Sequence, residues 1–147
     1  MSKNMLAVGD DAPQFEGLSQ NEETLLLFMG KVGRSNAKGK SRGLLDAKKQ
    51  PTAEEVKVCL VWDNSEEEVQ AFKSTFPGLI ELSNVCDIYD LDQSIQTNYK
   101  SMLYVVSDAD DEELGFPDYL IKNGKIIWAQ ENENFYKLSL ILRGWRP

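Results

Sequence analysis

The sequence predicts an α/β fold with a mixed central β-sheet and helices on both of its faces. Two early apolar runs of strand length, Thr24–Met29 and Val56–Trp62, are each followed by a helix-like segment, an order typical of parallel strands. Later in the chain, Asp118–Ile121 and Lys125–Ala129 flank Asn123-Gly124, a dipeptide that strongly indicates a tight β-hairpin. The hairpin adds two antiparallel strands to the parallel pair, so the sheet is expected to be mixed.

The first unit begins with the short apolar run Thr24–Met29, which suits a buried strand. The stretch that follows, residues 30–43, is rich in glycine and in basic residues and predicts a loop. Residues 43–49 then predict a short helix. Pro51 ends it, because proline lacks the N–H that a continuing helix needs.

The second unit begins with Val56–Trp62, which is apolar and β-branched on both faces, as expected for a central parallel strand. Ser65 and Glu68 follow with the spacing of a capping box, so a helix is expected to begin there. Its expected buried stripe consists of Val69, Phe72 and Phe76.

A second capped helix is predicted over residues 92–100, with Ile95 and Tyr99 on one face. Asp90 and Asp92 precede it and are well placed to accept hydrogen bonds from its first backbone N–H groups. We therefore interpret these two acids as caps rather than as part of a metal site.

The last third of the chain predicts a short strand at residues 103–106 and an amphipathic closing helix at residues 135–142. Between them, Ser107–Glu113 holds five acids, which predict an exposed loop. These carboxylates could bind calcium, but they lack the spacing and the glycine of an EF-hand loop. A solvated acidic loop is the preferred interpretation.

The composition limits the chemistry that is available. A chain of 147 residues with 41% hydrophobic residues can bury its own core, so residues 1–147 are expected to form a single domain. Histidine is absent, which removes the usual general base near neutral pH and most zinc sites. The two cysteines form no Cys-x-x-Cys pair. Cys59 is expected to be a buried, inert thiol, and Cys86 has no cation beside it in the sequence to make it reactive.

The charge is unevenly distributed. The chain carries a net charge of −8, which disfavours nucleic acid as a partner. Residues 31–49 nevertheless hold seven bases and one acid, a local charge of +6, so the remainder carries −14. This asymmetry indicates a basic patch on an acidic body.

Three segments resemble the thioredoxin superfamily. Val8–Phe15 resembles the lead-in of peroxiredoxins, and Cys59–Ser65 followed by Phe72-Lys73 resembles the second strand and helix of tryparedoxins and nucleoredoxins. Phe116–Ile126 resembles the segment that carries the superfamily's cis-proline and hairpin, with Pro117 at the proline position. The resemblance implies a three-layer α/β/α sandwich that ends in a β-hairpin and a closing helix, and it implies that the Phe116–Pro117 bond is cis.

The same resemblance places the family's catalytic cysteines at the start of the helix after the first long strand. The matching stretch here is Val32–Asn36, which contains no sulfur. In the peroxiredoxin register, the threonine and the peroxidatic cysteine fall near Arg34 and Ala37. The resemblance therefore implies the fold of the superfamily for this chain, but it implies no catalytic residue.

What remains at that helix N-terminus is a set of polar and basic residues. Exposed N–H groups and basic side chains at a helix start favour an anion. The candidate residues for binding an anionic ligand or a protein partner are Arg34, Ser35, Asn36, Lys38 and Lys40. A nucleotide-binding P-loop is disfavoured, because Arg34 stands where the motif needs its first glycine.

The sequence thus favours a redox-inactive thioredoxin-like binding module that uses this face and its basic residues. The alternative is an atypical thiol oxidoreductase or peroxiredoxin-like antioxidant protein that acts through Cys59 or Cys86. No cofactor, metal or membrane segment is expected. The N-terminus shows no secretory signal, so the cytoplasm is the expected location.

Overall fold

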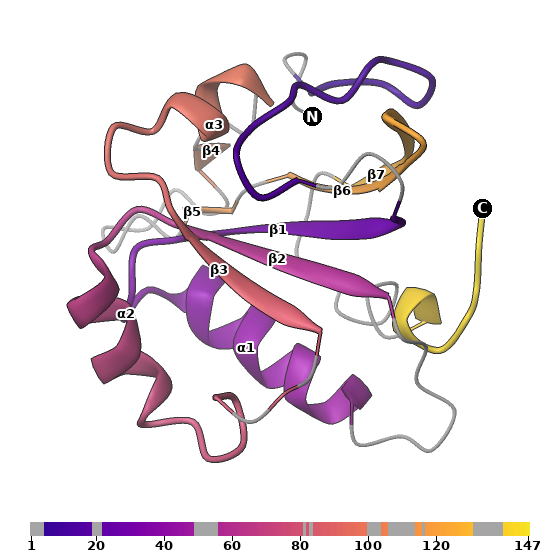
Figure 1. Ribbon diagram of the computed structural model, residues 1–147. Coiled ribbons are helices and arrows are strands. Elements are labelled where there is room, and N and C mark those ends of the chain that lie inside the picture. Colours follow the sequence, from indigo (N-terminus) through magenta and orange to yellow (C-terminus); the bar gives the residue numbers. More distant parts are fainter. Residues whose placement is uncertain are drawn as a thin grey trace.

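The computed structural model describes residues 5–18, 22–48, 56–80, 82, 84–99, 104–105, 114–115, 117–130 and 140–147. Its main sheet has five strands in the order β3-β2-β1-β6-β7 (Figure 1). These strands are β1 (Thr24–Gly30), β2 (Lys57–Trp62), β3 (Val85–Tyr89), β6 (Asp118–Lys122) and β7 (Lys125–Gln130). Strands β1, β2 and β3 are parallel, whereas β6 is antiparallel to both β1 and β7. The mixed sheet expected from the sequence is confirmed.

The two strands expected at the centre are buried most deeply. All seven residues of β1 and five of the six residues of β2 are buried, because layers of side chains cover both faces of the sheet. The edge strand β3 was not expected. Its residues are all half-buried, and Asp87 interrupts its apolar pattern, so its sequence does not resemble a buried strand.

Helices cover both faces of this sheet. Helices α1 (Ser35–Lys48) and α2 (Glu66–Lys73) lie on one face, and α3 (Ser94–Asn98) lies on the other (Figure 1). The three layers agree with the expected sandwich. The start expected for the first helix was wrong, since α1 begins at Ser35 and not near residue 43. Its inward side chains, which include Ala37, Leu44 and Ala47, pack in the core, and this packing overrides the weak helix propensity of the glycines.

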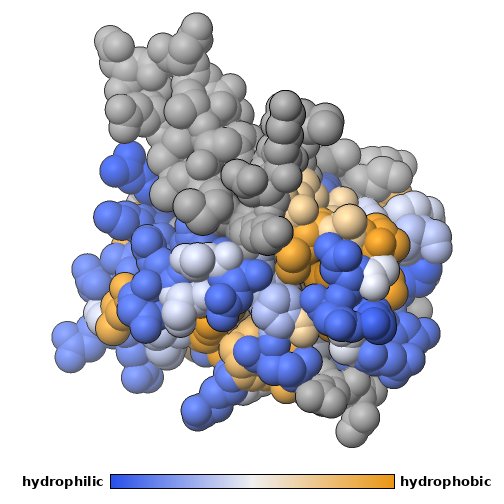
Figure 2. All heavy atoms as spheres, turned by 90° about the horizontal axis from the view of Figure 1, so that it is seen from above, coloured by the Kyte–Doolittle hydropathy of each residue, from blue (hydrophilic) through white to orange (hydrophobic). Residues whose placement is uncertain are grey.

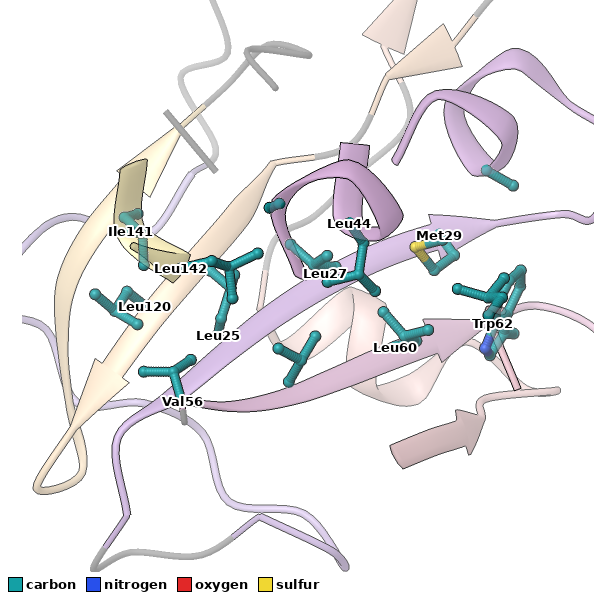
Figure 3. Close-up of a cluster of buried hydrophobic side chains, with 14 of the residues drawn as sticks. Leu25, Leu27, Met29, Leu44, Val56, Leu60, Trp62, Leu120, Ile141 and Leu142 are labelled. Carbon is teal, nitrogen blue, oxygen red and sulfur yellow. The ribbon is translucent and has the colours of Figure 1, made fainter. Parts of the chain in front are cut away.

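The core has one cluster on each face of the sheet. On the α1 face, Leu25, Leu27 and Met29 of β1 meet Leu60 and Trp62 of β2 (Figure 3). On the α3 face the alternate residues of the same strands form the second cluster, which includes Leu26, Phe28, Cys59 and Val61. This alternation is the period-two geometry of a strand buried on both faces.

Residues 140–142 are helical, and Ile141 and Leu142 are buried in the first cluster, as Figure 3 shows. The rest of the expected closing helix lies outside the described residues. The hairpin is confirmed, since β6 and β7 pair around Asn123 and Gly124 with φ values of 53° and 75°. A type I′ turn needs positive φ at both positions.

Two short strands, β4 (Tyr104–Val105) and β5 (Leu114–Gly115), form a separate antiparallel pair. The expected strand at residues 103–106 therefore exists as β4. The acidic stretch Ser107–Glu113 lies outside the described residues, so its calcium-site alternative stays open. Within the described part of the chain, no group of three or more acidic, cysteine or histidine side chains could hold a metal ion.

Both predicted sets of helix caps are present. The Asp90 carboxylate accepts hydrogen bonds from the backbone N–H groups of Ile95 (3.1 Å) and Gln96 (2.9 Å), and Asp92 accepts one from Ser94 (3.1 Å). At the start of α2, Ser65 Oγ accepts a hydrogen bond from the backbone N of Glu68 at 3.4 Å. The Ser65 backbone N in turn donates to Glu68 Oε1 at 3.2 Å, which completes the capping box.

Ser65→Ala is expected to lower the free energy of unfolding by about 1 kcal/mol, because it leaves a backbone N–H at the start of α2 without its cap. Urea unfolding followed by tryptophan fluorescence measures the change. Glu67→Ala is the control, since it removes an exposed acid from the same helical turn without touching the capping pair. Equal losses in the two variants would contradict a role for the cap.

Candidate functional site

The helix N-terminus where the family places its cysteines is formed by the junction of β1 and α1. Strand β1 ends at Gly30, and α1 begins at Ser35. The two side chains of the candidate set that face solvent here are those of Arg34 and Lys38. Ser35 is the first residue of α1, and its side chain lies outside the described part.

Two other residues of the candidate set, Asn36 and Lys40, are buried, so their expected role in binding a ligand was wrong. Asn36 Nδ2 donates hydrogen bonds to the backbone oxygens of Phe28 (2.9 Å) and Met29 (2.8 Å). Lys40 Nζ donates to the Phe28 oxygen at 2.8 Å as well. Both side chains therefore satisfy carbonyl groups at the end of β1 instead of facing a ligand.

The ammonium of Lys40 also forms an ion pair with Asp118, the first residue of β6. Lys40 Nζ lies 2.8 Å from Asp118 Oδ1, and both side chains have an exposed fraction of 0%. Asp118 Oδ1 also accepts a hydrogen bond from the Phe28 backbone N at 2.9 Å. Burial raises the pKa of the Asp118 carboxyl, and the Lys40 ammonium opposes that shift. The pair joins α1, β1 and β6 beneath the start of the helix.

The sequence does contain a signal for this arrangement. Ala37, Lys40, Leu44 and Ala47 follow one another at intervals of three or four residues, which is the buried stripe of a helix. Because residues 30–43 were predicted to be a loop, this stripe was not predicted. Once α1 begins at Ser35, Lys40 must point inward.

Pro117 is buried and directly precedes β6, which is the position that the resemblance implies for it. The structure has no cis peptide bond in the part that it describes. Phe116 lies outside that part, so the cis isomer of the Phe116–Pro117 bond stays a prediction.

On the opposite face of the sheet, the structure brings the two cysteines together. Strands β2 and β3 pair in parallel with Cys59 directly opposite Cys86, and the two Sγ atoms are 3.1 Å apart. Both thiols are free; Cys59 is fully buried and Cys86 is half-buried. Neighbouring strands lie about 4.8 Å apart, which is within the Cα separation that a disulfide allows. The expected burial of Cys59 is confirmed, whereas its contact with Cys86 was not expected from the sequence.

The surroundings of the pair shift the pKa values of the two thiols in opposite directions. The Cys59 thiol donates a hydrogen bond that lowers the pKa of Cys86 to about 7, and the Lys57 ammonium adds to this against the effect of burial. The hydrogen bond to Cys86 and burial both raise the pKa of Cys59. When one proton leaves the pair, the negative charge therefore resides on the half-buried Cys86, and Cys59 keeps its proton. Lys57 is the cation that was not evident beside Cys86 in the sequence.

The lead-in segment, residues 5–18, packs over this face, where Leu6, Phe15 and Leu18 join the cluster that contains the two cysteines. Lys57 Nζ donates to the Gly17 oxygen at 2.9 Å, and Tyr99 Oη donates to the Pro13 oxygen at 2.6 Å. A Cβ atom at Gly17 would lie 3.0 Å from Ile88 Cδ1, so the backbone approaches β3 closely there. Seen from this side in Figure 2, hydrophilic residues cover much of the described surface, with hydrophobic residues gathered in patches among them.

The chain matches no family model and no curated protein. Its resemblance to known proteins lies in solved structures. A peroxiredoxin-like protein from Aquifex aeolicus superposes with a TM-score of 0.68 at 15% identity, covering 95% of this chain and 87% of that one. Reduced Prx3 from Vibrio vulnificus in complex with H2O2 gives 0.62 at 13% identity, covering 95% and 98%. A thioredoxin-like protein from Parabacteroides distasonis gives 0.60 at 19% identity, covering 95% and 97%.

These identities are low, so the comparisons bear on the fold. The chain has a thioredoxin-like α/β fold, as its resemblance to that superfamily implied. Among the described residues, no helix is both long and apolar enough to cross a membrane.

Proposed function

We propose that this protein is an atypical thiol oxidoreductase, in which Cys86 is the attacking thiolate and Cys59 is the resolving thiol. The observation that carries the proposal is the 3.1 Å contact between the two Sγ atoms on paired strands. The half-buried position of Cys86 and its pKa of about 7 support the order in which the two thiols react.

The proposed reaction is thiol–disulfide exchange with a low-molecular-weight disulfide. The Cys86 thiolate attacks one sulfur of the substrate, forms a mixed disulfide and expels the first substrate thiolate. The Cys59 thiol then loses its proton and attacks Cys86 Sγ, which forms the Cys59–Cys86 disulfide and expels the second thiolate. Two protein thiols lose two electrons, and one substrate disulfide gains them.

The sequence favoured a redox-inactive binding module, because the start of α1 carries no cysteine. That argument concerns one position of the fold only. The thiol pair supplies two neighbouring sulfurs on the other face of the sheet, and it therefore favours the oxidoreductase alternative. The structural neighbours support this choice through their shared fold alone.

The test is to incubate the reduced protein with oxidised glutathione and to follow its free thiols and intact mass. We expect the wild type to lose both free thiols and to decrease in mass by two hydrogens, without retaining glutathione. Dithiothreitol should restore both free thiols. Because the chain has only two cysteines, each single variant is the control for the other. Cys59→Ser should keep glutathione on Cys86, and Cys86→Ser should react little.

Two results would contradict the proposal. One is a wild type that keeps two free thiols after prolonged oxidation while remaining folded by circular dichroism. The other is equal formation of the glutathione adduct in the two variants, since the pair would then have no preferred attacking thiol.

A further inference from the structure

The outer face of α1 carries a row of cations. Arg34, Lys38 and Arg42 are spaced four residues apart, and all three are exposed. Arg34 immediately precedes α1, and its backbone oxygen accepts a hydrogen bond from the Lys38 N at 3.0 Å, so the row begins with helical geometry. Four residues advance a helix by about 6 Å. The row thus presents three positive charges along a line of about 12 Å.

These charges have no acidic partner within the described part of the chain, where none of the three forms an ion pair. Arg42 lies over the ring of Phe76, 5.9 Å from its centroid, and this contact orients its guanidinium. Burial raises the pKa of the Asp63 carboxyl, and the charge of Lys31 opposes that rise, so Lys31 lies near Asp63 and does not extend the row. Asp46 continues the line by one turn and bounds the patch with a negative charge.

We propose that this cationic row (Arg34, Lys38 and Arg42) docks an acidic segment of a protein partner. Carboxylates at four-residue intervals on a helix, or at every second residue of an extended chain, repeat at about 6 Å and match the row. Outside residues 31–49 the protein carries a charge of −14, which repels a long polyanion such as nucleic acid. A short acidic peptide can be confined to the three cations, which Asp46 bounds at one end.

The row and the thiol pair lie on opposite faces of the sheet, because α1 covers one face and Cys59 belongs to the cluster on the other. This proposal therefore stands independently of the proposed redox function. Its test leaves both cysteines unchanged.

The experiment measures binding of a labelled helical peptide with glutamates at four-residue intervals, by fluorescence anisotropy at low and at physiological ionic strength. A peptide with glutamine in place of glutamate is the neutral control. Binding is expected at low salt and should weaken as salt rises, because exposed charges are screened over about 8 Å at physiological ionic strength.

Two charge-matched double variants locate the site. Arg34→Gln/Lys38→Gln and Lys122→Gln/Arg143→Gln both change the net charge from −8 to −10, and all four side chains are exposed. The first variant should weaken binding about fivefold at low salt, which is the loss of two exposed charge pairs. The second should change it little.

Three binding results would overturn the proposal: no binding at low salt, equal weakening in the two double variants, or tighter binding of a single-stranded oligonucleotide than of the peptide. Salt-sensitive self-association in light scattering that the first variant abolishes would also overturn it, because a second copy of the chain would then be the occupant.

Discussion

Replacing Lys40 by methionine is expected to lower the free energy of unfolding at neutral pH by about 3–5 kcal/mol. Methionine fills a similar volume but carries no charge, so the Asp118 carboxylate stays fully buried without the cation 2.8 Å away. The Phe28 carbonyl loses a hydrogen-bond donor in the same substitution. Urea unfolding measured by tryptophan fluorescence, with Trp62 buried in the core, reports the change.

Two variants separate the ion pair from other effects. Lys38→Met changes an exposed lysine of the same helix and should cost little. Lys40→Met/Asp118→Asn removes the uncompensated charge, while the amide oxygen can still accept from the Phe28 N–H, so more than half of the loss should be recovered. A Lys40→Met loss no larger than that of Lys38→Met would contradict the importance of the pair.

The same variant has a defined pH dependence. Burial raises the pKa of Asp118 above its ordinary value of 3.8, and removing Lys40 removes the main opposing charge. The folded state then binds a proton more tightly than the unfolded state does, so its stability rises as the pH falls through the raised pKa. The deficit of Lys40→Met relative to the wild type should therefore shrink toward acidic pH. A deficit that grows on acidification would contradict this sign.

Alkylation of Cys86 by iodoacetamide is expected to reach half of its maximal rate near pH 7, because the reactive thiolate forms at that pKa. The Cys59 thiol is the main cause, through its hydrogen bond to Cys86. Cys59→Ala should therefore move the midpoint up by about 1.5 pH units, toward the value of an ordinary cysteine. Intact-mass measurement of the alkylated fraction against time, at a series of pH values, gives the midpoint.

Graded variants identify the cause of the shift. Cys59→Ser keeps a hydrogen-bond donor and should move the midpoint less than Cys59→Ala does. Lys57→Gln removes a smaller contribution and should also give a smaller upward shift. An unchanged midpoint in Cys59→Ala would show that Cys86 does not depend on its neighbour.

Features that depend only on neighbours along the chain could be predicted from the sequence. The capping box of Ser65 and Glu68 spans one helical turn, and the turn at Asn123-Gly124 depends on two adjacent backbone conformations. The apolar run of β2 indicated a central strand, because burial of both faces requires hydrophobic residues at every position.

The two arrangements with the largest expected effects arise only in the folded protein. Cys59 and Cys86 are 27 residues apart and meet because β2 and β3 pair in one particular register, and the weak apolar pattern around Asp87 did not reveal β3 at all. Lys40 lies in a segment that the sequence predicted to be a loop. The segment is instead part of α1, which packs against the sheet so that Lys40 meets Asp118 at the start of β6. Strand register and helix placement are set by packing between distant segments, so side-chain contacts that depend on them cannot be derived from local sequence patterns.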